Sequence, residues 1–326
     1  MQSVVTGLVV GYALVMAGVA AAIVAIGDAS AAGMLLLFGP RWLLPWPWLV
    51  LVPLAWRARW WVRGAAVLGA AVTLFGVALW NVPFARLRGP ASDDAAGPTL
   101  RVVTWNTDGR PLTAEQLAAY LPRWNAQLVL LQDCRGDALT VLARRRRDFS
   151  AYRDGEFCVI SRLPAHRLAV AAEGKRRAGR AIGFDVAWAG RLLRMVTVHL
   201  PSPRDELGAA RQGNPSRLAG SVAERSAASQ RLSEWALAGA RQADALVVAG
   251  DFNLPYGSRA LRRDWGTLRN AFADAGWGLG HTMFAGRHRV RIDHVLASPT
   301  LVARSARVLS GYPAEHQPVV VEYGWR

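Results

Sequence analysis

The pattern of apolar residues changes once along the chain, between residues 87 and 99. Two long uncharged runs precede the change, Val4–Ile26 and Gly64–Val82. Each is long enough for a helix that crosses a bilayer, which takes about 20 apolar residues. Between them, Ala31–Trp56 is interrupted by glycine, arginine and prolines, so only its part from Trp42 onward is expected to span, aided by its flanks. Residues 1–87 are therefore predicted to be a membrane segment with about three transmembrane helices.

Two features of these runs favour membrane helices that are retained in the mature protein. No Lys or Arg precedes Val4, whereas a cleaved signal peptide carries basic residues before its apolar region. The alternative, a hydrophobic hairpin buried in a soluble protein, does not call for three such runs so close together. Tryptophans cluster near the proposed helix ends, as they do at membrane interfaces: Trp42, Trp46, Trp48, Trp56, Trp60, Trp61 and Trp80.

The arginines of this segment predict its orientation. Arg57, Arg59 and Arg63 occupy the short link between the second and third apolar stretches. Cytoplasmic loops carry an excess of basic residues, so this link is predicted to be cytoplasmic and the chain after the third run extracytoplasmic. Arg86 and Arg88, just beyond that run, argue for the opposite side. The prediction is a multi-pass protein of the cell membrane whose remaining residues face away from the cytoplasm.

The chain after the membrane segment has the pattern of a linker and then of an α/β domain. Residues 88–98 are rich in Gly, Pro, Ala and Asp and are predicted to be a linker. Residues 99–326 alternate short β-rich runs with a few helical stretches, such as Thr113–Leu121 and Pro215–Ala240. Strands are predicted within LRVVTWN, AQLVLLQD, EFCVISR, AIGFDVAW, LLRMVTVHL, ALVVAGDFN, RIDHVLAS and PVVVEY.

Polar residues gather where these strands begin or end. An Asp-x-Asn pair alone is a frequent turn sequence, and an isolated histidine such as His281 or His288 is assigned to a surface or structural role. The recurrence of such residues at strand termini is what indicates an active site above a sheet. The set comprises Asn106, Asp108, Asp133, His199, Asp251, Asn253, Asp293, His294, Glu315 and His316.

The order of these motifs resembles the endonuclease/exonuclease/phosphatase superfamily, which includes DNase I, apurinic/apyrimidinic endonucleases, neutral sphingomyelinases and inositol polyphosphate phosphatases. The resemblance covers roughly residues 100–326 and implies a four-layer α/β sandwich of two packed mixed sheets. The matching segments are WNTDG (105–109), VLLQD (129–133), VTVHLP (196–201), GDFN (250–253), RIDHVL (291–296) and AEHQPV (314–319).

The resemblance also implies a role for each matching residue. Asp251 is expected to position or deprotonate the attacking water, and His316, held by Asp293, to face the scissile phosphate. Asn253 and His199 are expected to bind that phosphate, with Arg180 and Arg225 as weaker matches. The expected cofactor is Mg²⁺ or Mn²⁺, because the predicted ligands are carboxylate and carbonyl oxygens: Asp133, Asn106, Asp108 and Glu315.

Two of these ligands depart from the pattern of the superfamily. Asp133 stands where members usually have Glu, and Glu315 stands where they usually have Asp. Each change moves a carboxylate by about one methylene, which matters to Mg²⁺ because it demands near-ideal octahedral geometry. The departures are compatible with an active enzyme, with an altered metal preference or with a phosphate-binding module that has lost catalytic power.

The composition gives the chain a strongly positive net charge but does not identify its substrate. The chain has 39 Lys and Arg against 23 Asp and Glu, a net charge of +16. A basic domain favours an anionic partner, which points to a membrane-anchored nuclease, although arginine-rich coding bias gives the same composition. The membrane segment equally favours a phospholipid or sphingomyelin phosphodiesterase. Cys134 and Cys158 lack the spacing of metal ligands and are expected to be free buried thiols, with pairing outside the cytoplasm as the alternative.

Overall fold

The fold is described from a computed structural model of the chain. Most of the predicted linker, residues 88–98, lies outside the described residues, so its prediction stays open. The structure describes residues 2–84, 97–146, 148–171, 179–204, 208, 212–286 and 288–326.

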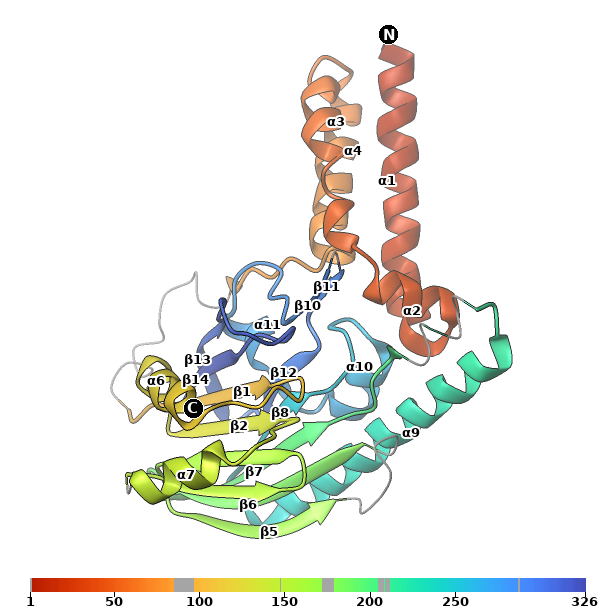
Figure 1. The fold of residues 1–326 in the computed structure, drawn as a ribbon. Helices are drawn as coiled ribbons and strands as arrows, with labels where there is room; N and C mark the ends of the chain where they lie inside the picture. Colours follow the sequence, from red (N-terminus) through yellow and green to blue (C-terminus); the bar gives the residue numbers. More distant parts are fainter. Residues whose placement is uncertain are drawn as a thin grey trace.

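Two six-stranded mixed sheets form the centre of the domain (Figure 1). The first has the order β13-β14-β1-β2-β4-β3, and only β1 and β2 run parallel among its pairs. Its strands are β1 (Leu100–Asn106), β2 (Leu128–Gln132), β3 (Ser150–Asp154), β4 (Phe157–Ser161), β13 (Leu301–Val308) and β14 (Val319–Trp325).

The second sheet has the order β5-β6-β7-β8-β12-β9, with β7 and β8 parallel. β1 and β8 are both inner strands of their sheets. Asn106, the last residue of β1, therefore lies close to Asp251, the last residue of β8. Its strands are β5 (Ala165–Ala171), β6 (Arg180–Trp188), β7 (Arg191–His199), β8 (Ala245–Asp251), β9 (Arg269–Asn270) and β12 (Asp293–Ala297).

Helices cover the outer face of each sheet and complete four layers. One apolar core lies between the sheets, and it includes Val102, Leu130, Met195 and Val247. A second core packs α6 (Ala114–Trp124) and α7 (Ala138–Arg145) on the first sheet, and a third packs α9 (Pro215–Gly239) and α10 (Arg259–Trp265) on the second. The predicted four-layer α/β sandwich is therefore confirmed.

The predicted elements correspond to observed ones, with additions at the edges. All eight predicted strands and both predicted helices are present, and α6 begins with the capping box Thr113–Gln116. Six further strands of the described residues were not predicted, because they are short or irregular and carry arginine or lie beside glycine turns. They are β3, β5, the two-residue β9, β13 and the hairpin of β10 (Met283–Ala285) and β11 (His288–Val290). The short helix α11 (Ala271–Ala275) also went unpredicted.

The first 80 residues form a bundle of apolar helices that stands on the domain (Figure 1). Among the described residues, two helices are long and apolar enough to cross a membrane: α1 (Gln2–Ala25) and the continuous stretch Trp60–Val77, which joins α4 (Trp60–Ala71) to a π-helical end, η3 (Val72–Val77). The middle stretch bends by 64° between Ala32–Phe38 and Arg41–Ala55, so it adds a third candidate only if counted as one broken span. Its helices are α2 (Ala31–Phe38), the short η2 (Arg41–Leu43) and α3 (Trp48–Ala55).

Specific contacts fix this bundle to the domain. The Asp28 carboxylate accepts hydrogen bonds from the backbone N–H groups of Arg259 and Ala260 at the start of α10, at 2.7 and 3.2 Å. Asn81 Nδ2 donates to the carbonyl oxygen of Phe272 at 2.8 Å. Ile23, Met34, Leu37, Phe38 and Val77 share an apolar cluster with Val290 and Ile292 of the domain. The orientation of the bundle is thus set by side chains on both sides of the predicted linker.

The two cysteines correct one prediction. Cys134 and Cys158 were expected to be free buried thiols, and this is wrong, because they form a disulfide across 24 residues of sequence. Cys134 follows the end of β2 and Cys158 lies in β4, the strand that pairs with β2. Adjacent antiparallel strands bring the two side chains within bonding reach, a proximity that sequence separation alone does not reveal.

Candidate active site

Asp251 lies at the centre of the predicted site, at the end of β8. Its carboxylate is buried and receives three hydrogen bonds. Asn106 Nδ2 donates to Oδ2 at 2.8 Å, Asn253 Nδ2 donates to the same oxygen at 3.2 Å, and the Asn253 backbone N–H donates to Oδ1 at 2.8 Å. The GDFN turn allows this because Asn253 adopts a left-handed φ of 49°, which returns its side chain toward Asp251.

The surroundings of Asp251 favour a proton acceptor. Burial raises the pKa of its carboxyl, and the nearby negative charge of Asp293 raises it further. His316, His199 and the hydrogen bond from Asn106 act in the opposite direction without cancelling the shift. A carboxylate with a raised pKa is a better base than one in water, and general bases work best when their pKa approaches the working pH.

His316 and Asp293 form a buried pair next to Asp251. His316 Nδ1 lies 2.9 Å from Asp293 Oδ2, and its Nε2 lies 3.9 Å from Asp251 Oδ2. Burial by itself would lower the pKa of His316, but the charges of Asp293 and Asp251 outweigh it and raise this pKa to about 9. The imidazole is therefore cationic at neutral pH, with Nε2 directed to the side of Asp251.

The loop that carries His316 is held from two directions. Trp105 Nε1, one residue before Asn106, donates to the His316 carbonyl oxygen at 2.9 Å. The Gln317 backbone N–H donates to the Thr282 carbonyl oxygen at 2.7 Å, while the Thr282 hydroxyl accepts from the backbone N–H of Asp293 at 3.0 Å. The two members of the pair are thus positioned by the same threonine.

His199 occupies the opposite side of Asp251, at the end of β7. Its Nε2 lies 3.7 Å from Asp251 Oδ2 and its Nδ1 lies 3.6 Å from Glu156 Oε2. Burial opposes protonation of His199, but its interaction with Glu156 and the charge of Asp251 prevail, so its pKa is raised above the usual value. A second histidine, whose protonated form Glu156 and Asp251 favour, therefore faces Asp251.

Acidic side chains beside His199 form a candidate metal site. Ligand atoms of Asp133, Glu156 and His199 all lie within 4.8 Å of one another. Asp251, Asp293 and His316 make a second such group, but their atoms are already engaged with each other and are fully buried. The first group is only half-buried and offers carboxylate oxygens, which suit a hard divalent cation that keeps part of its water.

Glu156 is the site residue that the sequence did not reveal. It lies in the tight turn Asp154–Gly155–Glu156 before β4 and has the appearance of an ordinary solvated hairpin acid. Its backbone carbonyl accepts a hydrogen bond from the N–H of Cys134 at 2.9 Å, which holds it beside Asp133. Asp133, which has a left-handed φ of 48°, is shorter than the usual glutamate, and Glu156 supplies a second carboxylate at that point.

These residues line one cleft of about 320 Å³. Asn106, Asp108, Asp133, His199, Asp251, Asn253 and His316 were all predicted from the sequence and all contribute to its wall. The wall also contains Phe38, from the end of α2 in the membrane segment. Other lining residues are Glu156, Leu200, Pro201, Ser202, Pro203, Arg204, Ser221, Glu224, Met283 and Ile292.

Three other predicted residues lie at the edge of this cleft or beneath it. Glu315 is partly exposed and pairs with Arg204 at 3.2 Å, and the same guanidinium lies 3.9 Å from Asp108. Arg180 pairs with Asp154 at 3.4 Å and packs over the ring of Phe157.

Arg225 is buried under the GDFN turn. Its NH1 donates to the Asn253 carbonyl oxygen at 3.1 Å, and its NH2 lies 2.8 Å from Met34 Sδ. This position supports Asn253 from behind, whereas the sequence suggested contact with phosphate.

Comparison with known proteins agrees with the geometry. The model of the Endonuclease/Exonuclease/phosphatase family matches residues 103–315. No curated protein sequence matches the chain.

Solved structures share the fold at low identity. Humanized TDP2 of D. rerio is 16% identical with a TM-score of 0.51, covering 69% of this chain and 99% of that one. A mannosyl-6-phosphatase of Bacteroides thetaiotaomicron is 14% identical with a TM-score of 0.51, covering 69% and 100%. The human nocturnin catalytic domain, solved with a sulfate anion, is 18% identical with a TM-score of 0.50, covering 72% and 96%.

Proposed function

Because the chain belongs to the endonuclease/exonuclease/phosphatase family of phosphoric ester hydrolases, we propose that it hydrolyses phosphodiesters with a divalent cation, Mg²⁺ or Mn²⁺. The observation that carries this proposal is the buried group around Asp251: Asn106 and Asn253 fix its carboxylate, and the His316–Asp293 pair lies beside it. A phosphodiester repels hydroxide, so its hydrolysis needs a positioned water and neutralisation of charge.

The residues of the chain divide these tasks. Asp251 orients the attacking water and accepts its proton, aided by its raised pKa. His316, cationic because its pKa is raised to about 9, faces the charge that develops on the phosphoryl oxygens. The Asn253 amide and His199 bind the same phosphate from the other side. Arg225 acts indirectly, by holding the Asn253 backbone.

The cation would be held by Asp133 and Glu156, with Asn106 and Asp108 nearby on the cleft wall. When bound, it would neutralise phosphate charge and stabilise the leaving oxygen. Asp133 is one methylene shorter than the glutamate usual at this position, and the nearby Glu156 carboxylate would supply the cation with a second ligand. Glu315 forms an ion pair with Arg204 at the edge of the cleft, so we assign it no direct contact with the cation.

We further propose that the N-terminal helices anchor the enzyme in the cell membrane with the domain outside the cytoplasm. The exposed apolar side chains of α1 and α4 support insertion, among them Leu14 at 68% and Leu68 at 67% exposure. The link between α3 and α4, whose sequence includes Arg57 and Arg59, lies at the end of the bundle far from the domain (Figure 1). The Cys134–Cys158 disulfide supports an oxidising compartment, since such bonds are rare in the cytosol.

Nucleic acid is the first substrate class that we propose, on the strength of the net charge of +16. A phospholipid headgroup is the second, and one specific observation favours it. Phe38 comes from the membrane segment yet lines the catalytic cleft, so a substrate leaving the bilayer would reach the site along α2.

The decisive test uses the full chain in detergent with a chromogenic phosphodiester. We expect turnover with Mg²⁺ or Mn²⁺, none with a chelator, and at least about a hundredfold loss in Asp251→Asn, the usual scale for a lost general base. Asp148→Asn, an exposed aspartate paired with Arg146, is the matched control and should keep full activity. Metal-independent turnover, or an unaffected Asp251→Asn variant, would overturn the mechanism.

A substrate panel on the same preparation separates the two substrate classes. Plasmid nicking, release of headgroup from labelled sphingomyelin and release of phosphate from inositol phosphates are measured in parallel. Activity on lipid alone removes the nuclease assignment. Silence across the panel together with metal binding favours the third possibility, a phosphate-binding module that has lost catalytic power.

A further inference from the structure

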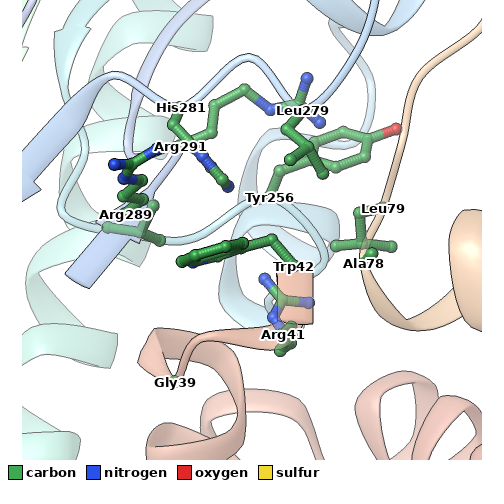
Figure 2. A pocket seen from close by; sticks show the side chains of 11 residues that line it. Gly39, Arg41, Trp42, Ala78, Leu79, Tyr256, Leu279, His281, Arg289 and Arg291 are labelled. Carbon is green, nitrogen blue, oxygen red and sulfur yellow. The ribbon is translucent and has the colours of Figure 1, made fainter. Parts of the chain in front are cut away.

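A second pocket lies outside the catalytic cleft, where the membrane segment meets the domain (Figure 2). Arg41 and Trp42 line it from η2, Ala78 and Leu79 from the end of the last apolar helix, and Arg289 and Arg291 from around β11. The pocket therefore lies at the domain-side end of the apolar helices, the level of a headgroup layer if these helices span a bilayer.

The lining of this pocket is strongly cationic. Figure 2 shows Arg41, Arg289, Arg291 and His281 grouped around the ring of Trp42. Neither Asp nor Glu is among the lining residues within the described part of the chain. Burial and the three arginines lower the pKa of His281 to about 4, so this ring is neutral at physiological pH and presents one N–H and one acceptor nitrogen.

Arg291 is the most unusual member of the set. It is 4% exposed, and within the described residues none of its three guanidinium nitrogens has a hydrogen-bond partner. Its contacts are the faces of Tyr256 at 4.0 Å and Phe272 at 4.6 Å. Burial lowers the pKa of Arg291 only to about 10, so it remains charged. A buried, unpaired guanidinium is unfavourable unless an anion completes it.

Two further donors point to the same ligand. Trp42 Nε1 is buried without a partner among the residues described. Arg289 is exposed and stacks over the Trp42 ring at 5.3 Å, so it can change rotamer to admit a ligand. The pocket itself measures about 20 Å³, which fits an atom group the size of one phosphate oxygen before Arg289 moves. Guanidinium groups bind phosphate in bidentate fashion, and several of them match its oxygens.

We propose that this pocket binds a phosphate group, carried by the headgroup of an anionic phospholipid, and thereby fastens the membrane segment to the catalytic domain. The lipid source rests on the proposed membrane anchoring, whereas the phosphate chemistry does not. The site also adjoins the catalytic cleft, because Gly39 and Arg291 line the pocket while the next residues, Phe38 and Ile292, line the cleft. Occupancy would therefore stabilise the cleft wall that α2 contributes.

The experiment measures binding, so its result does not depend on hydrolysis. The full chain, stripped of lipid in detergent, is placed in nanodiscs of phosphatidylcholine alone or with a fifth of phosphatidylglycerol or phosphatidic acid. Retained lipid is counted by native mass spectrometry, and the melting temperature is recorded. A separate arm titrates inorganic phosphate without lipid.

The variants are Arg41→Gln, which replaces a half-buried arginine, and Arg289→Gln, which replaces an exposed one. The control is Arg123→Gln, an exposed arginine of α6 on the far side of the first sheet. We expect anionic lipid to raise the melting temperature of the wild type and the control, and the pocket variants to bind it at least tenfold more weakly. A variant-sensitive response to inorganic phosphate alone supports the phosphate site and assigns it to a soluble phosphoester.

Equal lipid and phosphate responses in the wild type and both pocket variants would overturn the proposal. If the variants fail to fold in phosphatidylcholine, the test rests on lipid and phosphate binding by the wild type. The proposal is wrong if the delipidated wild type binds neither one anionic lipid per chain nor phosphate. If the wild type binds anionic lipid but hydrolyses no phosphodiester, the proposed function is refuted and this site still stands.

Discussion

The His316–Asp293 pair shows how single residues control charge in this site. Asp293 is buried, and its carboxylate is the nearest charge to the imidazole, at 2.9 Å. Burial lowers the pKa of His316, and Asp293 opposes it both by its charge and by its hydrogen bond, with Asp251 and Asp108 adding to the effect. Without Asp293 the pKa of His316 would therefore fall.

Asp293→Asn should make activity sensitive to alkaline pH. In the wild type, kcat/KM is expected to fall as pH rises through about 9, where His316 loses its proton. In the variant the pKa of His316 falls, so the alkaline limb moves down by at least about one unit and activity at pH 8 drops at least about twofold. A pH profile of kcat/KM measures this, with Asp148→Asn as control; superimposable profiles would contradict the role.

At the level of elements, the site depends on the pairing of β2 with β4. This pairing brings Asp133, at the end of β2, beside Glu156, which precedes β4. The Cys134–Cys158 disulfide joins the same two segments, and the Cys134 N–H binds the Glu156 carbonyl. The covalent link therefore holds the two acidic residues that are the candidate cation ligands.

Replacement of both cysteines by serine removes the disulfide and should let Asp133 and Glu156 move relative to each other. The bond closes a loop of 24 residues, for which the chain-entropy model gives about 3 kcal/mol of stabilisation. We expect a lower melting temperature and about a tenfold rise in the Mg²⁺ concentration for half-maximal activity, the scale seen when groups behind metal ligands are removed. Wild type treated with a reductant should behave likewise. An unchanged Mg²⁺ requirement would separate the disulfide from the metal site.

The whole molecule couples an apolar bundle to a catalytic domain. Asp28 binds the start of α10, Asn81 binds the carbonyl of Phe272, and Phe38 forms part of the cleft wall. Asp28 follows α1, Asn81 follows η3 and Phe38 ends α2, so these contacts lie at the domain-side ends of the apolar helices. The cleft is therefore held close to the level at which the apolar helices end.

This arrangement predicts the side of the membrane on which the domain lies. Gln2 Nε2 lies 3.4 Å from the carbonyl oxygen of Arg57, so the N-terminus and the arginine-rich link share one side, opposite the domain. Alkaline phosphatase fused after Arg326 should be active in intact bacteria, and fused after Arg57 inactive, because it folds only outside the cytoplasm. The reverse pattern would place the domain in the cytoplasm and contradict the proposed topology.

Local patterning carried the predictions that the sequence supports alone. Apolar runs of membrane length, β-rich runs and the polar residues that follow them are short-range signals. They gave the α/β class, which the structure confirms, and they predicted the division of the chain and the site residues Asn106, Asp251, Asn253 and His316, which the structure brings to one cleft. The tertiary structure decided what depends on strand pairing and packing. Glu156 and the Cys134–Cys158 bond arise from the pairing of β2 with β4, and the burial of Arg225 and Arg291 arises from the docking of the membrane segment. None of these contacts has a local signal, because each joins residues distant in sequence whose own segments read as ordinary turns or strands.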